Sequence, residues 1–270
     1  MITLRGEETN FSSIPHKLKN YFMPAAYRSL VRLSQTPSIK QVLEECYRLA
    51  YPFHPPEFYS TYKNSANNLR KATRLLATLL MNNSISTNQL SLRADKIAQD
   101  ILQKFLYAKW KIMSVDNRIK ESDNGNIVKA WTIFEETYKP GIRGVYLRET
   151  LVKLLNTPFG YDNNTLKLLL SAWIGYHQHD LQFTSISQQI GIEGLTSILN
   201  EITGHKTFIG EICGPHKVSV SRRDAGELVR EVTSLIELVN RGTLTQSEAD
   251  ETINKLKIHS ALSSHGYDLA

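Results

Sequence analysis

Residues 164–176 read Asn-Thr-Leu-Lys-Leu-Leu-Leu-Ser-Ala-Trp-Ile-Gly-Tyr, a strongly apolar stretch in a chain of 270 residues. Apolar side chains would cover nearly the whole circumference of a helix formed here, and such a helix is stable only inside a protein. The stretch therefore predicts a buried helix, which other elements of the chain must surround.

The segments before this helix show the spacing of amphipathic helices, with apolar residues recurring every three or four positions. Gly125 and a run of polar residues interrupt that spacing near residue 120 and indicate a linker. We expect helices over Ile39–Leu49, Phe58–Met81, Thr87–Ser114, Val128–Tyr138 and Leu147–Leu155.

The segments after the buried helix predict a winged helix-turn-helix. We expect a strand at Leu181–Thr184, short helices at Ser185–Ile190 and Glu193–Thr203, and a β-hairpin that pairs Lys206–Cys213 with Lys217–Val220 as the wing. Two further helices, Asp224–Asn240 and Gln246–Ile258, close the chain. The predicted fold is mainly α and multi-helical, with one winged helix-turn-helix element.

Charge divides the chain unequally. Residues 1–129 hold 19 Lys and Arg against 10 Asp and Glu, a net charge of +9, whereas residues 130–270 hold 13 against 16, a net charge of −3. We expect a basic helical domain at 1–126 that resembles an AAA lid, a helical and winged-helix domain at 127–222, and a helical hairpin at 223–270. The basic half is the one expected to meet phosphate.

Composition and motifs exclude several classes of protein. The chain has only two cysteines, no apolar run of membrane-spanning length and no signal-peptide stretch, so we expect a cytoplasmic protein. It has no Walker loop, dinucleotide turn, nucleophile elbow, HExxH or CxxC, so we expect no enzyme, catalytic residue or cofactor. A metal is not expected either, because the spacing of the candidate ligands is not that of zinc sites. Those ligands are His177, His179, Asp180, His205, Cys213 and His216.

Basic side chains suggest contacts to nucleic acid. Lys63, Arg70 and Arg74 share one face of the helix that precedes Asn82, and this face either binds phosphates or is simply solvated. The helix Glu193–Thr203 carries carboxylates and no Lys or Arg, so we expect it to pack on protein and not to read bases. The candidate nucleic-acid contacts are Lys63, Arg70, Lys71, Arg74, Lys206, Lys217, Arg222 and Arg223.

Two short motifs resemble a known family. Tyr51-Pro-Phe-His-Pro-Pro56, followed by a helix with Arg74-Leu-Leu-Ala-Thr-Leu-Leu80, is similar to a segment just beyond the ATPase core of the large P-loop ATPases of BREX and related phage-defence systems. Thr157-Pro-Phe-Gly-Tyr161 resembles an element further along the same proteins. The resemblance covers roughly residues 45–180.

The resemblance implies a role for Arg74 and a set of partners. Arg74 matches an arginine that could sense bound nucleotide phosphate. No Walker A or B motif precedes it, so the chain is either a fragment of a larger ATPase or a separate subunit. The implied function is a non-catalytic module for assembly and sequence-tolerant DNA engagement. Its partners would be a P-loop ATPase core or other defence subunits, with double-stranded DNA as a candidate and no membrane. The alternative is a freestanding nucleic-acid-binding regulator.

Overall fold

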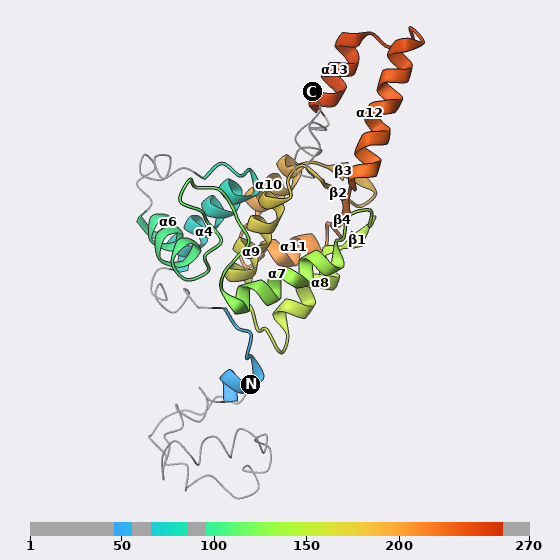
Figure 1. Ribbon diagram of the computed structural model, residues 1–270. Coiled ribbons are helices and arrows are strands. Elements are labelled where there is room, and N and C mark those ends of the chain that lie inside the picture. The colour runs from blue at the N-terminus through green and yellow to red at the C-terminus, as the bar shows by residue number, and fades with distance from the viewer. Residues whose placement is uncertain (1–45, 56–65, 86–95, 256–270) are drawn as a thin grey trace, which may run out of the picture.

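The computed structural model describes residues 46–55, 66–85 and 96–255. They form a mostly helical protein with a small antiparallel sheet, so the predicted mainly α class is confirmed (Figure 1). The helices of the body are α4 (Ala66–Met81), α6 (Lys96–Ile101), the π-helix η3 (Leu102–Tyr107), α7 (Gly125–Thr137), α8 (Leu147–Leu155), α9 (Asn163–Tyr176), α10 (Ile192–Glu201) and α11 (Phe208–Cys213). Two more, α12 (Ala225–Asn240) and α13 (Gln246–Lys255), follow. None of the helices in the described ranges is both long and apolar enough to cross a membrane.

Helix α9 is the buried helix that the sequence predicts. Asp162 caps its N-terminus, and every residue from Thr165 to Gly175 is buried. Trp173 stacks on Phe134 of α7, with 5.3 Å between the ring centroids. Helix α9 therefore forms the centre of the body, with other helices packed around it.

Helix α4 packs closely along α9. Its apolar face, which includes Leu69, Leu76 and Leu80, is fully buried. At Gly175 the two helices nearly touch: a Cβ atom added there would lie 2.0 Å from the carbonyl oxygen of Leu80 and 2.8 Å from Cδ1 of Ile119. Only glycine lets the backbones approach this closely.

The hydrophobic core does not divide at residue 126. One cluster of buried residues runs from Leu69 to Val220, so the predicted boundary between 126 and 127 does not separate two cores. The region after residue 222 differs, because α12 and α13 pack on each other and project from the body (Figure 1). We call this pair the arm. Its small cluster consists of Leu228, Val232, Leu235 and Ile253.

The sheet corrects two predictions. Its strands run in the order β1 (Val145–Tyr146), β4 (Ser219–Arg222), β2 (Leu181–Ser185) and β3 (Gln188–Ile190), with antiparallel neighbours. The predicted helix at Ser185–Ile190 is wrong, because Ile186 and Ser187 adopt positive φ and turn the chain back on itself. The hairpin in this region is thus β2–β3.

The predicted wing strand Lys206–Cys213 is also wrong, since helix α11 occupies most of it. The side chain of Thr207 accepts a hydrogen bond from the backbone N–H of Gly210 and caps the helix. Phe208 and Ile212, four positions apart, are both buried on one face. The apolar residues of this segment therefore follow helical spacing, and the hairpin with Lys217–Val220 does not form.

The two motifs that carry the family resemblance pack against each other. Phe53 donates a backbone hydrogen bond to the carbonyl of Pro158 at 3.2 Å, and its ring lies 5.5 Å from that of Phe159. Gly160 has a φ of +64°, and a Cβ there would lie 2.3 Å from the ring of Tyr51. Segments more than a hundred residues apart thus form one aromatic cluster.

We expect Gly175→Ala to destabilise the protein by about 3 kcal/mol, because the new methyl group meets backbone that cannot rotate away. The measurement is the free energy of unfolding in urea. Gly125→Ala is the control, since a Cβ there meets nothing within 4 Å, and it should change stability by less than about 1 kcal/mol. Equal stability of the two variants would contradict the close approach of α4 and α9.

Candidate anion-binding site

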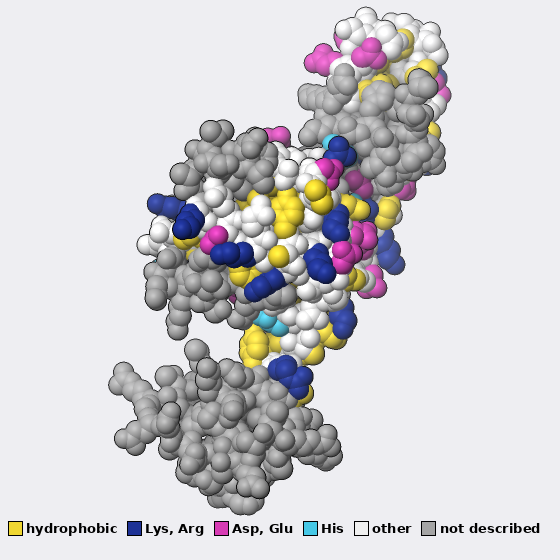
Figure 2. All heavy atoms as spheres, turned by 60° about the vertical axis from the view of Figure 1, so that its left-hand side comes forward, with side chains coloured by type: hydrophobic (Ala, Val, Ile, Leu, Met, Phe, Trp, Pro, Cys, Tyr) yellow, Lys and Arg dark blue, Asp and Glu magenta, His cyan; other side chains and the backbone are white. Residues whose placement is uncertain are grey.

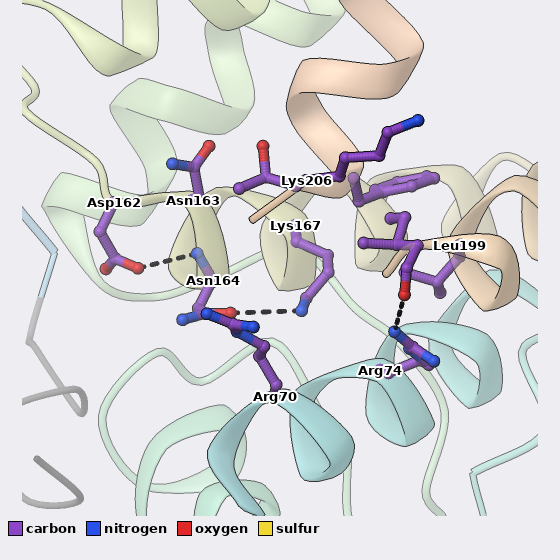
Figure 3. Close-up of a pocket in the computed structure, with 11 residues that line it drawn as sticks. Arg70, Arg74, Asp162, Asn163, Asn164, Lys167, Leu199 and Lys206 are labelled. Atoms are coloured by element: carbon purple, nitrogen blue, oxygen red, sulfur yellow. Dashed lines mark hydrogen bonds between the residues drawn. The ribbon is translucent and has the colours of Figure 1, made fainter. Parts of the chain in front are cut away.

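A cavity of about 300 Å³ lies where the start of α9 meets α4 and the segment between α10 and α11 (Figure 3). Four basic side chains line it: Arg70 and Arg74 from α4, Lys167 from α9, and Lys206. Asp162 is the one carboxylate among its described lining residues. The lining is therefore strongly positive, and we call this space the basic cavity.

Lys167 is the most buried of the four basic side chains that line this cavity, and it is only 7% exposed. Its amine donates to the hydroxyl of Thr73 at 2.7 Å and to Oδ1 of Asn164 at 3.2 Å, and both partners are neutral. Within the described part of the chain it forms no ion pair with a carboxylate. Burial and the charges of Arg74 and Arg70 outweigh the opposite effect of Asp162 and lower the pKa of Lys167 to about 8.

Asp162 offsets only part of the positive charge of the cavity, and its carboxylate also caps helix α9. One oxygen accepts the backbone N–H groups of Asn164 at 2.8 Å and Thr165 at 3.2 Å. The hydroxyl of Thr165 donates to the other oxygen. The carboxylate thus satisfies the N-terminus of α9, and its single charge faces those of Arg70, Arg74 and Lys167.

The two arginines of α4 donate hydrogen bonds to the segment that connects α10 to α11. Arg74 is half-buried and donates to the carbonyl of Ile202 at 2.8 Å and more weakly to that of Asn200 at 3.4 Å. Arg70 is exposed and donates to the carbonyl of Gly204 at 3.0 Å. Every hydrogen-bond acceptor of these two guanidinium groups is neutral, so both remain available to an anion.

Lys206 lies at the rim of the basic cavity. Its side chain is exposed and its amine lies 3.5 Å from a carboxylate oxygen of Glu211. In Figure 3 this amine points away from Lys167. The structure therefore brings three cations of the cavity together, namely Arg70, Arg74 and Lys167, with Lys206 outside this group.

The remaining surface candidates lie apart from this group. Lys71 is exposed on α4, next to Arg70 in the sequence. Lys217 is exposed and lines a different cavity, beside Cys213. Lys63 lies outside the described residues.

Arg222 belongs to an internal ion cluster, which contradicts the prediction that it contacts DNA. It is 9% exposed and pairs with Asp180 at 3.0 Å and Glu135 at 2.8 Å. His177 bridges this cluster: its Nε2 lies 2.6 Å from Glu135, and its Nδ1 lies 3.1 Å from Arg222. Burial raises the pKa of Glu135, but His177, Arg222 and Trp173 outweigh that effect and bring it down to about 2.

Arg223 is likewise turned inward, so the prediction that it contacts DNA is contradicted as well. It is 7% exposed, donates to the carbonyl of His179 at 2.6 Å and lies 3.4 Å from Glu231 of α12. Arg223 therefore joins the arm to the body. Across the described ranges, no three His, Cys, Asp or Glu residues lie close enough together to hold a metal ion.

No protein-family model, curated protein or solved structure matches this chain. The function must therefore be argued from the chemistry of the basic cavity. Sequence reasoning selected Arg70, Arg74 and Lys206 but missed Lys167. The sequence feature that could have identified Lys167 is its place as a single lysine in an apolar helix, because a charge at a buried position marks either an ion pair or a binding site.

We expect the stability difference between Lys167→Met and the native protein to depend on pH. The pKa of about 8 in the folded protein lies below the ordinary lysine value of 10.5, so burying the charged amine costs stability at pH 7. That cost disappears as pH rises from 8 to 10.5, because the folded protein has already released the proton. The free energy of unfolding of Lys167→Met relative to that of the native protein should therefore fall by up to about 3 kcal/mol over this range. Urea unfolding at several pH values measures this, and a difference independent of pH would contradict the burial of a charged Lys167.

Proposed function

We propose that this chain is a non-catalytic module that binds the phosphate groups of nucleic acid at the basic cavity, without preference for sequence. The observation that carries the proposal is the convergence of Arg70, Arg74 and Lys167 with only neutral hydrogen-bond partners. Like charges placed together in a partly desolvated space repel each other. A bound anion removes that repulsion, so the arrangement favours an anionic ligand.

Phosphate suits this cavity better than a single carboxylate does. Guanidinium groups present fixed pairs of N–H donors that match phosphate oxygens. Lys and Arg side chains are also spread over the body on the face shown in Figure 2, so further phosphates of a long nucleic acid would meet positive charge.

The lack of a base-reading helix supports sequence tolerance. The exposed side chains of α10 include Glu193 and Glu201, and the helix has no Lys or Arg. Two elements of the winged helix-turn-helix predicted after α9 are replaced: strand β3 takes the place of its first short helix, and α11 takes the place of the first strand of its wing. The helix that was predicted at Glu193–Thr203 corresponds to α10. Contacts to phosphates alone carry no sequence information.

We also propose that this chain acts within a phage-defence ATPase system. Its support is the family resemblance, whose two motifs share one aromatic cluster, and the arm, which exposes Val229, Ile236 and Leu238. Exposed apolar side chains on a projecting helix suit contacts with another protein. Arg74 is the candidate to sense nucleotide phosphate on a partner core, because it already lies at the edge of the cavity.

We expect the double variant Arg70→Ala, Arg74→Ala to weaken binding to duplex DNA regardless of sequence. Two duplexes of unrelated sequence should lose affinity equally, and the slope of log affinity against log salt should become shallower by about 2. Fluorescence anisotropy over a series of KCl concentrations measures both quantities.

The control for this experiment is Arg241→Ala. Arg241 follows α12 at the far end of the arm, and its ion pair with Glu237 is exposed. This variant should bind as the native protein does. Unchanged affinity and slope in the double variant would refute the proposed function.

A further inference from the structure

We propose that the basic cavity takes a terminal phosphate monoester in preference to an internal phosphodiester. This inference rests on the proposed function and specifies its ligand. The ligand class is a phosphate with one organic substituent, and it has two possible sources. One is the 5′-phosphorylated end of a nucleic acid, and the other is a free mononucleotide.

The depth of Lys167 argues for a terminal group. Lys167 is nine-tenths buried between α9 and α4. Its amine donates hydrogen bonds to Thr73 and to Asn164, and Figure 3 shows the bond to Asn164. An internal phosphodiester is joined to a sugar on both sides. In a duplex it can therefore contact only side chains that are exposed at the protein surface. A phosphate at the end of a chain or on a small molecule has one free side. That side can enter the cavity and reach Lys167.

The charge of the cavity fits a dianion. Arg70, Arg74 and Lys167 donate to carbonyl, hydroxyl and amide oxygens, and none of these acceptors is charged. A phosphodiester carries one negative charge, whereas a monoester carries nearly two at neutral pH and offers three terminal oxygens. Three donor groups from two helices therefore match the three terminal oxygens of the monoester in number, and its larger negative charge offsets more of their positive charge than a phosphodiester does.

The size of the cavity agrees with this ligand. A volume of about 300 Å³ is at the lower end of the range for small-molecule sites. Such a space holds one phosphate with its attached sugar and excludes a length of duplex. The apolar side chains of Leu199 and Phe208 line the same cavity and would pack against the organic part.

The first experiment compares two duplexes of identical sequence, one with 5′-phosphate ends and one with 5′-hydroxyl ends, by fluorescence anisotropy at fixed salt. We expect the phosphorylated duplex to bind about tenfold more tightly, as for one set of charge-assisted hydrogen bonds. Lys167→Met should abolish this preference while both duplexes still bind. Arg70→Ala, at an exposed position that does not endanger the fold, should reduce it.

The matched control is Lys71→Ala, which removes an exposed cation from the same helix and outside the cavity. It should weaken both duplexes and leave their ratio unchanged. If the ratio of the two affinities, phosphorylated duplex over hydroxyl duplex, falls as far in Lys71→Ala as in Lys167→Met, the preference does not arise in the cavity and the inference is overturned.

The second experiment separates the two sources by using adenosine 5′-monophosphate as competitor, with adenosine as its control. Displacement of the phosphorylated duplex by the monophosphate but not by adenosine supports a free nucleotide. A phosphate-end preference without displacement supports the nucleic-acid end.

Equal affinity for the two duplexes, together with no binding of the monophosphate in calorimetry, would overturn this inference. The proposed function would stand in that case, provided that duplex binding still weakens in the double variant Arg70→Ala, Arg74→Ala. Binding of the monophosphate without any duplex binding would instead refute the proposed function and leave the monoester site in place.

Discussion

The close packing of α4 on α9 determines where everything else in this protein lies. At Gly175 the two backbones approach so closely that a methyl group has no room beside the carbonyl of Leu80. Toward the other end of the same seam, Thr73 of α4 accepts the hydrogen bond of Lys167 from α9. The basic cavity is thus a product of this helix pair, and three of its cations, Arg70, Arg74 and Lys167, are held by helices.

The two groups of buried charge in this protein serve opposite purposes. Around Arg222, the carboxylates of Glu135 and Asp180 offset the charge of the cation within the body. Around Lys167, the one carboxylate of Asp162 offsets only part of the charge of Lys167, Arg70 and Arg74. A protein that retains an unbalanced buried charge gives up stability at that place, and unbalanced sites of this kind are where function is commonly found.

The predictable parts of the fold are those that local pattern decides. The run of apolar residues at 164–176 was sufficient to predict α9, and helical spacing predicted α7, α8, α10 and α12 within a few residues, as well as the end of α4 at Met81. Segment 206–213 was predicted wrongly because its residues suit a strand by composition, whereas the Thr207 cap and the burial of Phe208 with Ile212 favour a helix. The role of Arg222 could not be predicted, since its partner Glu135 lies 87 residues away in the sequence.

The separation of α4 from α9 along the chain also sets an order of events during synthesis. Helix α4 ends at Met81 and leaves the ribosome well before α9, which begins at Asn163. Until then the apolar face with Leu69, Leu76 and Leu80 lacks the surface that covers it in the finished protein. The nascent chain must therefore carry an exposed hydrophobic helix through much of its translation, and a chain interrupted before Tyr176 would be prone to aggregate.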